Sequence, residues 1–230
     1  ITALPSSKID GLWDHLFFET YLKKNLLNHC KIGFYLSSLK LNSKIIESSK
    51  LIILSGPPGS GKTSVCKAIA QKLSTRLTSL NHYEKGNIKT LYSQGGLLIE
   101  LNCSKLFSRW YGESAKKVSN LFNDFEKMLQ NNKQIFIVLL IDEIETIAGS
   151  RKDLISKNEA SDGVRVVNTL LTHLDRLKKY DNILILTTSN LIDTIDPAIL
   201  DRSDSIFHFN EPSAEAIYFI LQNSINELIK

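Results

Sequence analysis

The chain has 230 residues, 43% of them hydrophobic and 23% charged, a globular composition that can bury a core and that excludes a disordered or collagen-like protein. At about 150 residues per domain, this length allows one large domain or two small ones. The excess of 28 Lys and Arg over 24 Asp and Glu is small, and it favours a solvated basic surface over a nucleic-acid patch.

The cysteines indicate the compartment, and the start of the chain indicates that it is part of a longer protein. Cys30, Cys66 and Cys103 form no Cys-x-x-Cys pair, which argues against a zinc or redox site, and free thiols fit a reducing compartment. We therefore expect the protein in the nucleus and cytoplasm. The longest apolar run, residues 135–141, is shorter than the roughly 20 residues that span a bilayer. Because the chain begins at Ile1 with neither an initiator Met nor a signal-peptide pattern, we expect a fragment of a longer protein.

Strand and helix patterns alternate after an N-terminal stretch, residues 1–50, that we expect to form a linker and a helix. Continuous apolar runs predict buried strands at residues 51–54, 97–101, 135–141, 183–188 and, more weakly, 206–209. Apolar residues at helical spacing predict four helices. One begins near residue 63, and the others cover residues 118–129, 164–174 and 216–228. Residues 81–96 and 148–162 are typical of loops. This alternation predicts parallel βαβ units in an α/β fold.

A phosphate-binding motif joins the first predicted strand to the next helix. The pattern G-x-x-x-x-G-K-[ST] is matched by Gly56, Pro57, Pro58, Gly59, Ser60, Gly61, Lys62 and Thr63, and we expect Ser64 to bind the nucleotide with them. The glycines let backbone N–H groups surround a β-phosphate at the helix N-terminus. Lys62 would reach the β- and γ-phosphates of ATP, and Thr63 would hold Mg²⁺. The alternative is a glycine-rich turn with a chance Lys-Thr pair, and the strand before it and the helix after it argue against that.

An acidic pair follows the apolar run at residues 135–141. Asp142 would bind Mg²⁺ directly or through water, and Glu143 would act as a general base on the water that attacks the γ-phosphate. Alone, Asp-Glu after a strand is an ordinary polar strand end, whereas together with the phosphate loop it predicts a site that hydrolyses a nucleotide. Glu145 is interpreted as a solvent-facing or helix-start residue.

Asn190 follows the strand predicted at residues 183–188. Ligands bind at the carboxyl ends of parallel strands, so we expect the Asn190 amide to hold the attacking water or an oxygen of the γ-phosphate. The alternative is an asparagine that serves only a turn.

Arg202 is the candidate for an arginine that acts on a neighbouring subunit. It follows a short predicted helix, from where it would reach the γ-phosphate bound to the next subunit. Arginines supplied in this way are worth roughly 10³–10⁵ in kcat in other NTPases. The alternative is an ion pair with Asp201 or Asp204, and Arg151 and Arg165 stay open as other candidates for the residue that acts in trans.

These motifs together resemble the AAA+ ATPases. The counterparts are Walker A at residues 56–63, Walker B at residues 139–143, sensor 1 at Asn190 and an arginine finger at Arg202. The resemblance implies ATP and Mg²⁺ as ligands and a P-loop NTPase fold, a five-stranded parallel sheet of order 5-1-4-3-2 between helices. It makes residues 51–211 the large ATPase domain and residues 212–230 the first helix of a truncated lid, without its sensor-2 residue.

Residues 104–114, after the second predicted strand, resemble the pore loop with which hexameric AAA+ remodellers grip a polypeptide. The aromatic pair Trp110 and Tyr111, followed by Gly112, would contact many kinds of side chain inside the ring. The alternative places both rings in the core, and the charged residues beside them favour exposure instead.

Three further stretches resemble the pachytene checkpoint AAA+ ATPases, also called thyroid-hormone-receptor-interacting HORMA remodellers: residues 4–6 with 11–14, residues 161–168 with 174–178, and residues 185–190 with 201–204. The resemblance implies a homohexamer that uses ATP to convert HORMA-domain proteins from a closed to an open form, directly or through an adaptor. Such proteins act in meiotic and spindle checkpoint control. No direct contact with nucleic acid or membrane is expected.

The pore loop leaves an alternative function open. Trp110-Tyr111-Gly112 departs from the Trp-Phe-Ser that the checkpoint ATPases often carry, and it is closer to microtubule-severing and membrane-scission AAA proteins. Those proteins usually carry an Arg-Pro-Gly-Arg or double-Arg signature, which residues 201–204 lack. A nucleotide-binding scaffold without activity is a third hypothesis, and the complete catalytic set argues against it.

Overall fold

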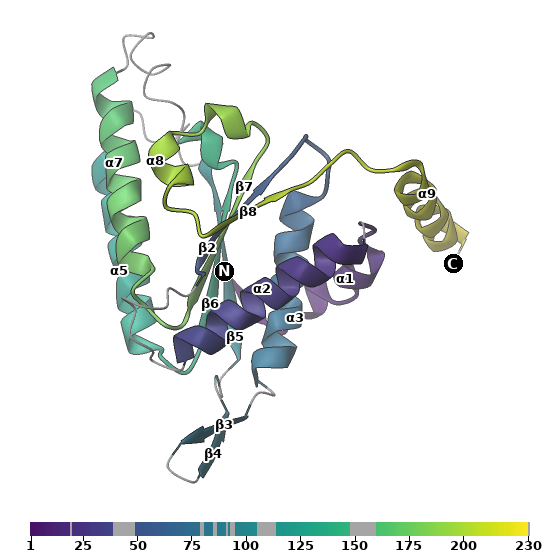
Figure 1. The fold of residues 1–230 in the computed structure, drawn as a ribbon, viewed down its shortest axis with the longest axis horizontal. Coiled ribbons are helices and arrows are strands. Elements are labelled where there is room, and N and C mark those ends of the chain that lie inside the picture. The colour runs from purple at the N-terminus through teal and green to yellow at the C-terminus, as the bar shows by residue number, and fades with distance from the viewer. Residues whose placement is uncertain are drawn as a thin grey trace.

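A mostly parallel sheet forms the centre of the structure, with helices on both of its faces (Figure 1). The computed structural model describes residues 1–18, 20–38, 49–78, 81–84, 87–90, 92, 95–104, 114–147 and 160–229. The main sheet has the strand order β1-β5-β6-β7-β2-β8. In this spatial order the strands are Thr2–Leu4, Gly96–Asn102, Phe136–Asp142, Ile183–Ser189, Leu51–Ser55 and Ser205–His208.

The predicted order of the parallel strands is confirmed. In chain order these strands are β2, β5, β6, β7 and β8, and they lie side by side as β8-β2-β7-β6-β5, which is 5-1-4-3-2. The sheet has one more strand than predicted, because β1 pairs antiparallel with the outer edge of β5, Thr2 opposite Leu98. β1 has three residues and no apolar run, so no strand pattern marks it.

Helices fill the connections between the strands, as the periodicities predicted. The longer ones are α2 (Thr20–Ser38), α3 (Lys62–Thr78), α5 (Ser114–Asn131), α7 (Ala160–Leu177) and α9 (Ala214–Ile229). The shorter ones are α1 (Leu12–His15), α8 (Pro197–Leu200) and the 3-10 helices Ser7–Ile9, Ile144–Thr146 and Ile192–Thr194. Within the described ranges, no helix has the length and apolar character needed to cross a membrane.

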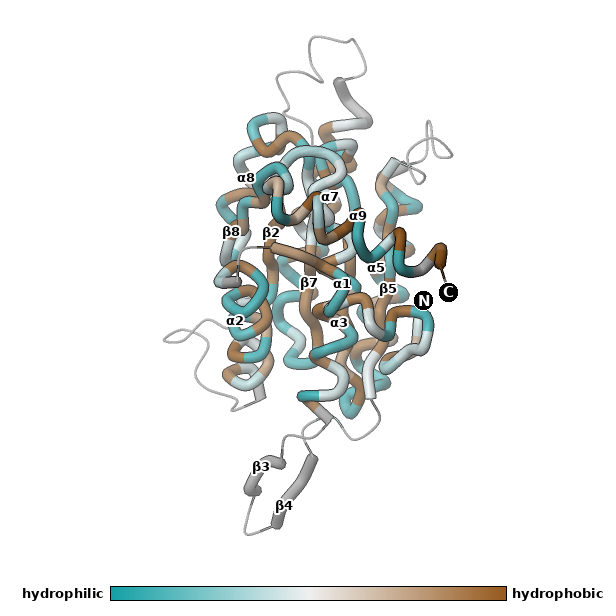
Figure 2. The backbone as a smooth tube through the Cα atoms, turned by 90° about the vertical axis from the view of Figure 1, so that its right-hand side faces the viewer, coloured by the Kyte–Doolittle hydropathy of each residue, from teal (hydrophilic) through white to brown (hydrophobic). Residues whose placement is uncertain are grey.

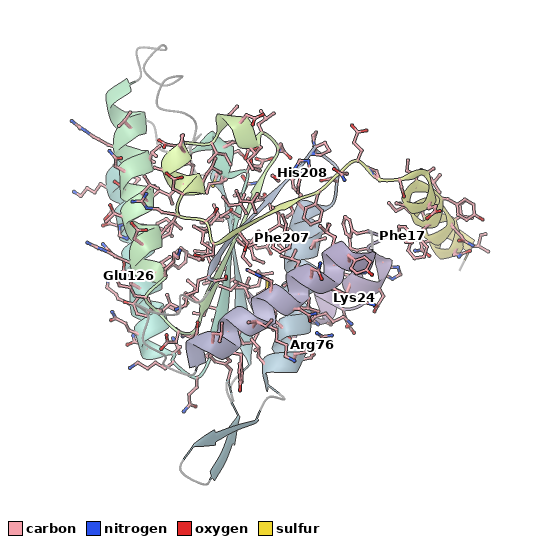
Figure 3. All side chains as sticks on the ribbon, in the orientation of Figure 1. Phe17, Lys24, Arg76, Glu126, Phe207 and His208 are labelled. Carbon is pink, nitrogen blue, oxygen red and sulfur yellow. The ribbon has the colours of Figure 1, made fainter. Side chains whose placement is uncertain are left out.

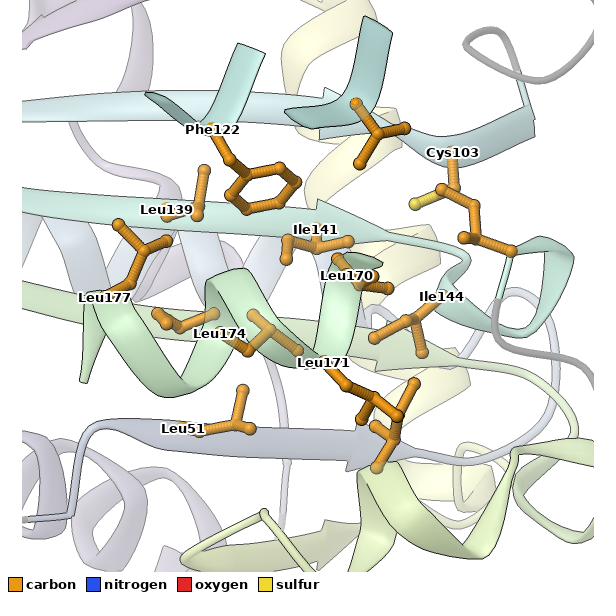
Figure 4. Close-up of a cluster of buried hydrophobic side chains, with 14 of the residues drawn as sticks. Leu51, Cys103, Phe122, Leu139, Ile141, Ile144, Leu170, Leu171, Leu174 and Leu177 are labelled. Carbon is orange, nitrogen blue, oxygen red and sulfur yellow. The ribbon is translucent and has the colours of Figure 1, made fainter. Parts of the chain in front are cut away.

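Alternate side chains of the strands β5, β6, β7 and β2 enter two separate hydrophobic cores. In β2, Leu51 and Ile53 pack in the core under α5 and α7, whereas Ile52 and Leu54 pack in the core under α2 and α3. Figure 4 shows the first of these cores, where side chains of α5 and α7 meet those of the sheet. Because both faces are covered, most residues of these strands are apolar (Figure 2), and this is why apolar runs predicted them.

Residues 81–96, predicted as a loop, hold a two-stranded hairpin before β5. β3 (Asn81–Glu84) pairs antiparallel with β4 (Asn87–Thr90), and the pair stands apart from the main sheet (Figure 1). Each strand has four residues, most of them polar, so neither forms an apolar run. In the other predicted loop, residues 148–162, α7 already begins at Ala160, and residues 148–159 lie outside the described ranges.

α9 exposes most of its apolar side chains. The Ser213 hydroxyl accepts a hydrogen bond from the Ala216 N–H at 3.2 Å and so caps the helix N-terminus. Ala216 is buried, whereas the apolar residues after it are exposed: Ile217, Tyr218, Ile220, Leu221, Ile225, Leu228 and Ile229. The division of the chain into residues 1–50, 51–211 and a lid helix at residues 212–230 stays a prediction.

Asp204 ties the start of β2 to the end of α7. Its Oδ2 accepts hydrogen bonds from the N–H groups of Lys50 and Leu51, each 2.7 Å long, and its Oδ1 accepts one from Lys178 Nζ at 2.7 Å. Replacing Asp204 by Ala leaves these donors without their charged partner, so we expect the free energy of unfolding to fall by about 2–4 kcal/mol, measured by urea denaturation. The exposed Asp193, changed to Ala, is the control; an equal loss in both variants would contradict this role.

Candidate active site

The phosphate loop connects β2 to α3 at the carboxyl end of the parallel strands. Gly56, Gly59 and Gly61 have φ angles of 151°, 77° and 85°. A Cβ atom on Gly56 would lie 2.1 Å from the carbonyl oxygen of Phe209, and one on Gly61 would lie 3.0 Å from Cζ of Phe18. Gly56 is therefore required by the close approach of another backbone, and Gly59 and Gly61 by their positive φ.

The Lys62 side chain folds back into this loop. Its Nζ donates hydrogen bonds to the carbonyl oxygens of Gly56 at 2.8 Å and Pro57 at 2.7 Å, and to the Ser60 hydroxyl at 3.2 Å. Pro58 lies in the turn that the Ser60 N–H closes by bonding the Pro57 carbonyl. Burial lowers the pKa of Lys62, while the charges of two nearby carboxylates act in the opposite direction. The ammonium group is thus already inside the loop that would hold a phosphate.

The amino end of α3 completes the loop. Thr63 and Ser64 lie in its first turn, and the Val65 N–H bonds the Gly61 carbonyl at 2.9 Å. The N–H groups of a first helical turn have no partner one turn earlier, and the helix dipole is positive there. This end therefore suits an anionic group, as the motif predicts.

Thr63, Asp142 and Thr188 meet at the carboxyl ends of β6 and β7. The hydroxyls of Thr63 and Thr188 both donate to Oδ1 of Asp142, at 2.8 and 2.5 Å, and the Thr188 oxygen accepts the Glu143 N–H at 3.1 Å. The structure therefore brings the predicted Walker A and Walker B residues into direct contact. No motif marks Thr188, because it belongs to the buried apolar run at residues 183–188; the signal that the sequence offers is a hydroxyl two residues before Asn190.

Glu143 has a left-handed backbone, with φ 57° and ψ 52°. In the described part of the chain it is the one non-glycine residue with positive φ. Such a conformation costs on the order of 1–3 kcal/mol and persists where the surroundings hold it. Here the N–H bond to Thr188 and the start of the 3-10 helix Ile144–Thr146 hold it. The chain therefore turns sharply at Glu143 and leaves the direction of β6 immediately after Asp142, the candidate metal ligand.

The residues predicted to hold Mg²⁺ suit that ion. The Thr63 hydroxyl and the Asp142 carboxylate are oxygen ligands, which Mg²⁺ prefers, and Mg²⁺ usually takes one or two protein ligands with phosphates and water. In the ranges that the structure describes, no group of three or more His, Cys, Asp or Glu could hold a metal by itself. The pair therefore fits a cation that arrives with a nucleotide.

Asn190 lies at the carboxyl edge of the sheet, as predicted, and contacts the Walker B segment. Its N–H donates to Oε1 of Glu145 at 3.0 Å. The other oxygen of Glu145, Oε2, is buried and has no hydrogen-bond partner among the described residues. The interpretation of Glu145 as a solvent-facing or helix-start residue missed this contact, because it depends on two segments that lie 45 positions apart.

Arg202 is held within its own chain. Its Nε donates to both carboxylate oxygens of Asp175 at 3.0 Å, and its Nη1 donates to the Ala198 carbonyl at 2.9 Å. Asp175 on α7 differs from the partners that the intramolecular alternative named. Arg165 is exposed on the same helix, and Arg151 lies outside the described residues. A role of Arg202 at a neighbouring subunit stays a prediction.

The predicted pore loop lies outside the described residues. Residues 105–113, which include Trp110, Tyr111 and Gly112, separate Ser104 from the start of α5 at Ser114. Their assignment stays a prediction.

A cleft of about 210 Å³ opens beside the phosphate loop. Three segments line it: the N-terminal segment with Leu16, Phe17 and Phe18, the loop residues Gly59, Ser60 and Gly61, and the chain from His208 through Pro212 to Ile220 of α9. Figure 3 labels Phe17 and His208 on two of these segments. No sequence pattern marks these cleft residues, because they are distant from one another in the chain and share no motif. The cleft has the size of a small-ligand fragment and continues from the phosphate loop.

The N-terminal wall of this cleft is fixed by Lys23. Lys23 Nζ donates to the carbonyl oxygens of Trp13 at 2.5 Å and Leu16 at 2.7 Å, and it lies 4.8 Å from the centroid of the Trp13 ring. Burial lowers the pKa of Lys23. Beyond this anchor, the Phe17 ring contacts that of Phe219 on α9, with centroids 5.2 Å apart. The wall thus joins the N-terminal segment to the last helix.

Comparison with known proteins identifies the family. The protein-family model described as "ATPase family associated with various cellular activities (AAA)" matches residues 52–211. The chain belongs to the AAA family of ATPases. It is 44% identical over 239 residues to Pachytene checkpoint protein 2 of Saccharomyces cerevisiae, covering 100% of this chain and 42% of the yeast protein. It is 39% identical over 228 residues to the human Pachytene checkpoint protein 2 homolog, covering 99% and 50%. The chain therefore spans about half the length of these curated relatives.

Solved structures agree with this assignment. "Structure of C. elegans PCH-2" matches 99% of this AAA chain and 53% of that chain, with a TM-score of 0.80 and 36% identity. A chain of "Structure of E. coli MS115-1 HORMA:CdnC:Trip13 complex" matches 95% of this chain and 71% of that chain, with a TM-score of 0.73 and 19% identity, which shows the fold alone. The predicted AAA+ fold and the resemblance to the pachytene checkpoint ATPases are confirmed.

Proposed function

We propose that this chain is the ATP-hydrolysing core of a protein remodeller that acts on HORMA-domain proteins. The observation that carries the chemistry is the 2.8 Å contact between Thr63 and Asp142, because it joins the phosphate loop to the acidic strand end in one site. Membership of the AAA family supports ATP as the nucleotide. Identities of 44% and 39% to pachytene checkpoint proteins support the class of remodeller.

ATP would occupy the phosphate loop and the cleft beside it. Its triphosphate would accept hydrogen bonds from the N–H groups of the loop and of the first turn of α3, and Lys62 would exchange its carbonyl partners for phosphate oxygens. The base would lie between the N-terminal wall and α9. Thr63 and Asp142 would hold Mg²⁺, which neutralises charge on the phosphates.

Glu143 and Asn190 would carry out the hydrolytic step. The Glu143 carboxylate takes a proton from a water as the water oxygen attacks the γ-phosphorus; the bond to the β–γ bridging oxygen breaks, and ADP and phosphate result. The Asn190 amide orients this water or a γ-phosphate oxygen. Arg202 of a neighbouring subunit would stabilise the charge that develops on the phosphate, after it leaves the ion pair with Asp175.

Assembly and substrate rest on the family resemblance. The protein would work as a homohexamer in which Trp110, Tyr111 and Gly112 grip a polypeptide, presented directly or by an adaptor. The match to a chain from a HORMA:CdnC:Trip13 complex is too low in identity to carry the substrate by itself. Three buried, unpaired cysteines, Cys30, Cys66 and Cys103, support a reducing compartment, for which we propose the nucleus and cytoplasm.

Changing Trp110 to Ala in the full-length protein tests this function. We expect ATP hydrolysis to continue and the conversion of a closed HORMA-domain protein to its open form to stop, because the ring loses a contact with the polypeptide. Phosphate release measures the first activity, and separation of the two HORMA forms by ion exchange measures the second. Tyr21→Ala, at a side chain that is 80% exposed, is the aromatic control.

Two outcomes would contradict the proposal. Unchanged conversion by the Trp110 variant would remove the pore assignment. Co-sedimentation of the full-length protein with microtubules, without capture of a HORMA-domain protein, would favour the severing alternative.

A further inference from the structure

Glu145 lies between the Walker B segment and Asn190, and the reaction proposed above gives it no role. It belongs to the 3-10 helix Ile144–Thr146, which begins directly after Glu143. This helix packs beside the end of β7, so the side chain reaches across from one strand end to the next. Its Oε1 accepts the Asn190 N–H at 3.0 Å.

The second oxygen of Glu145 is an exception to the usual pairing of buried polar groups. Oε2 is buried and makes no hydrogen bond to the residues that the structure describes. A buried acceptor without a partner loses the hydrogen bonds that water gives it in the unfolded chain, so it lowers stability. A glutamate kept only for stability would be poorly placed here. The cost indicates that the carboxylate serves the neighbouring site.

The contact joins the two strand ends that carry the proposed reaction. Glu145 lies two residues after Glu143, and its Oε1 holds the N–H of Asn190, which follows β7. Glu143 and Asn190 are the two residues expected to act at the γ-phosphate.

We infer that Glu145 is a positioning residue for the hydrolytic step, which holds the backbone of Asn190 so that the Asn190 amide faces the γ-phosphate end of the site. It touches neither the nucleotide nor the water and acts through Asn190. This inference rests on the proposed function of Asn190. It predicts that loss of Glu145 lowers kcat and leaves nucleotide affinity and KM nearly unchanged, because the phosphate loop and the cleft stay intact.

A double-mutant cycle in the full-length protein tests the inference. We expect Glu145→Ala to lower kcat by about 10- to 100-fold, the range that follows from a small misplacement of a reacting group. Asn190→Ala should lower kcat by about 100-fold, as loss of one polar group at a transition state does. In the Asn190→Ala background, Glu145→Ala should cause no further loss, because the side chain that it positions is gone.

A second variant and a control separate positioning from folding. Glu145→Gln keeps an oxygen for the Asn190 N–H, so we expect it to recover most of the kcat that Glu145→Ala loses. The exposed Asp193 lies in the 3-10 helix Ile192–Thr194 soon after Asn190, and Asp193→Ala should leave kcat unchanged. Binding of a fluorescent ADP analogue and urea denaturation report affinity and stability for each variant.

The outcomes distinguish this inference from the function on which it rests. Additive losses in the double variant, or a loss in affinity equal to the loss in kcat, would overturn the positioning role alone. An Asn190→Ala variant with full kcat would overturn the role of Asn190 and this inference with it.

Discussion

Replacing Glu143 by Gln should lower ATP turnover by about 10²–10⁴-fold while the nucleotide still binds, because the change removes a general base and keeps the shape of the side chain. The proposed phosphate contacts come from the loop, α3 and Lys62, and none of these depends on the Glu143 carboxylate. The left-handed backbone at φ 57° is equally open to Gln and Glu, and the N–H bond to Thr188 does not involve the side chain. The Glu143→Gln variant should therefore lose turnover and keep its affinity for ATP.

Phosphate release and binding of a fluorescent ATP analogue, both on the full-length protein, measure these two quantities. Glu215→Gln is the matched control, since Glu215 is an exposed glutamate in the first turn of α9. It should keep full turnover. Undiminished hydrolysis in the Glu143→Gln variant would mean that another group accepts the proton from water, and the role assigned to Glu143 would fall.

The parallel part of the fold could be predicted because burial on both faces imposes a simple pattern. Leu51 and Ile53 enter one core while Ile52 and Leu54 enter the other, so these four positions of β2 are all apolar. β1 and the β3–β4 hairpin have no such constraint. The three-residue edge strand β1 depends on its pairing with β5, far along the chain, and the four-residue strands of the hairpin are too short and too polar to form an apolar run.

The chemistry of the site could be predicted where a motif fixes both residue type and spacing. The phosphate loop and the Asp142-Glu143 pair were found in this way, and the structure joins them through Thr63. The contact of Glu145 with Asn190 and that of Thr188 with Asp142 connect separate strand ends. They follow only from the register of β6 beside β7, so no spacing along the sequence contains them.

The cleft shows a further limit of motif reasoning. The cation of Lys23 holds the carbonyl groups of Trp13 and Leu16, and this contact sets where the N-terminal wall stands relative to the phosphate loop. A lysine that anchors backbone carbonyls has no residue pattern of its own, since its partners are present at every position. The anchoring role of Lys23 follows from the distances between its Nζ and the carbonyl oxygens of Trp13 and Leu16.

The contacts of the Lys62 ammonium group predict a large loss of ATP affinity when this residue is replaced. The ammonium group is held by two loop carbonyls and one hydroxyl, so a nucleotide must replace these contacts with charge-assisted hydrogen bonds to phosphate. Because hydrogen bonds to charged groups contribute about 1.5–3 kcal/mol each, Lys62→Met should weaken binding of ATP by about 10- to 100-fold. Titration of the full-length protein with a fluorescent ATP analogue measures this loss.

Lys72→Met is the control for this prediction, because Lys72 lies on the same helix and is half-exposed in a long ion pair of 3.9 Å with Asp14. It should keep the affinity of the unaltered protein, and the rise in Tm that saturating nucleotide causes should persist in it and shrink in Lys62→Met. Equal affinity in both variants would mean that the loop N–H groups and the amino end of α3 bind the phosphates without the lysine. In that case the carbonyl contacts of Lys62 would be its whole function, as a brace that keeps residues 56–60 curved.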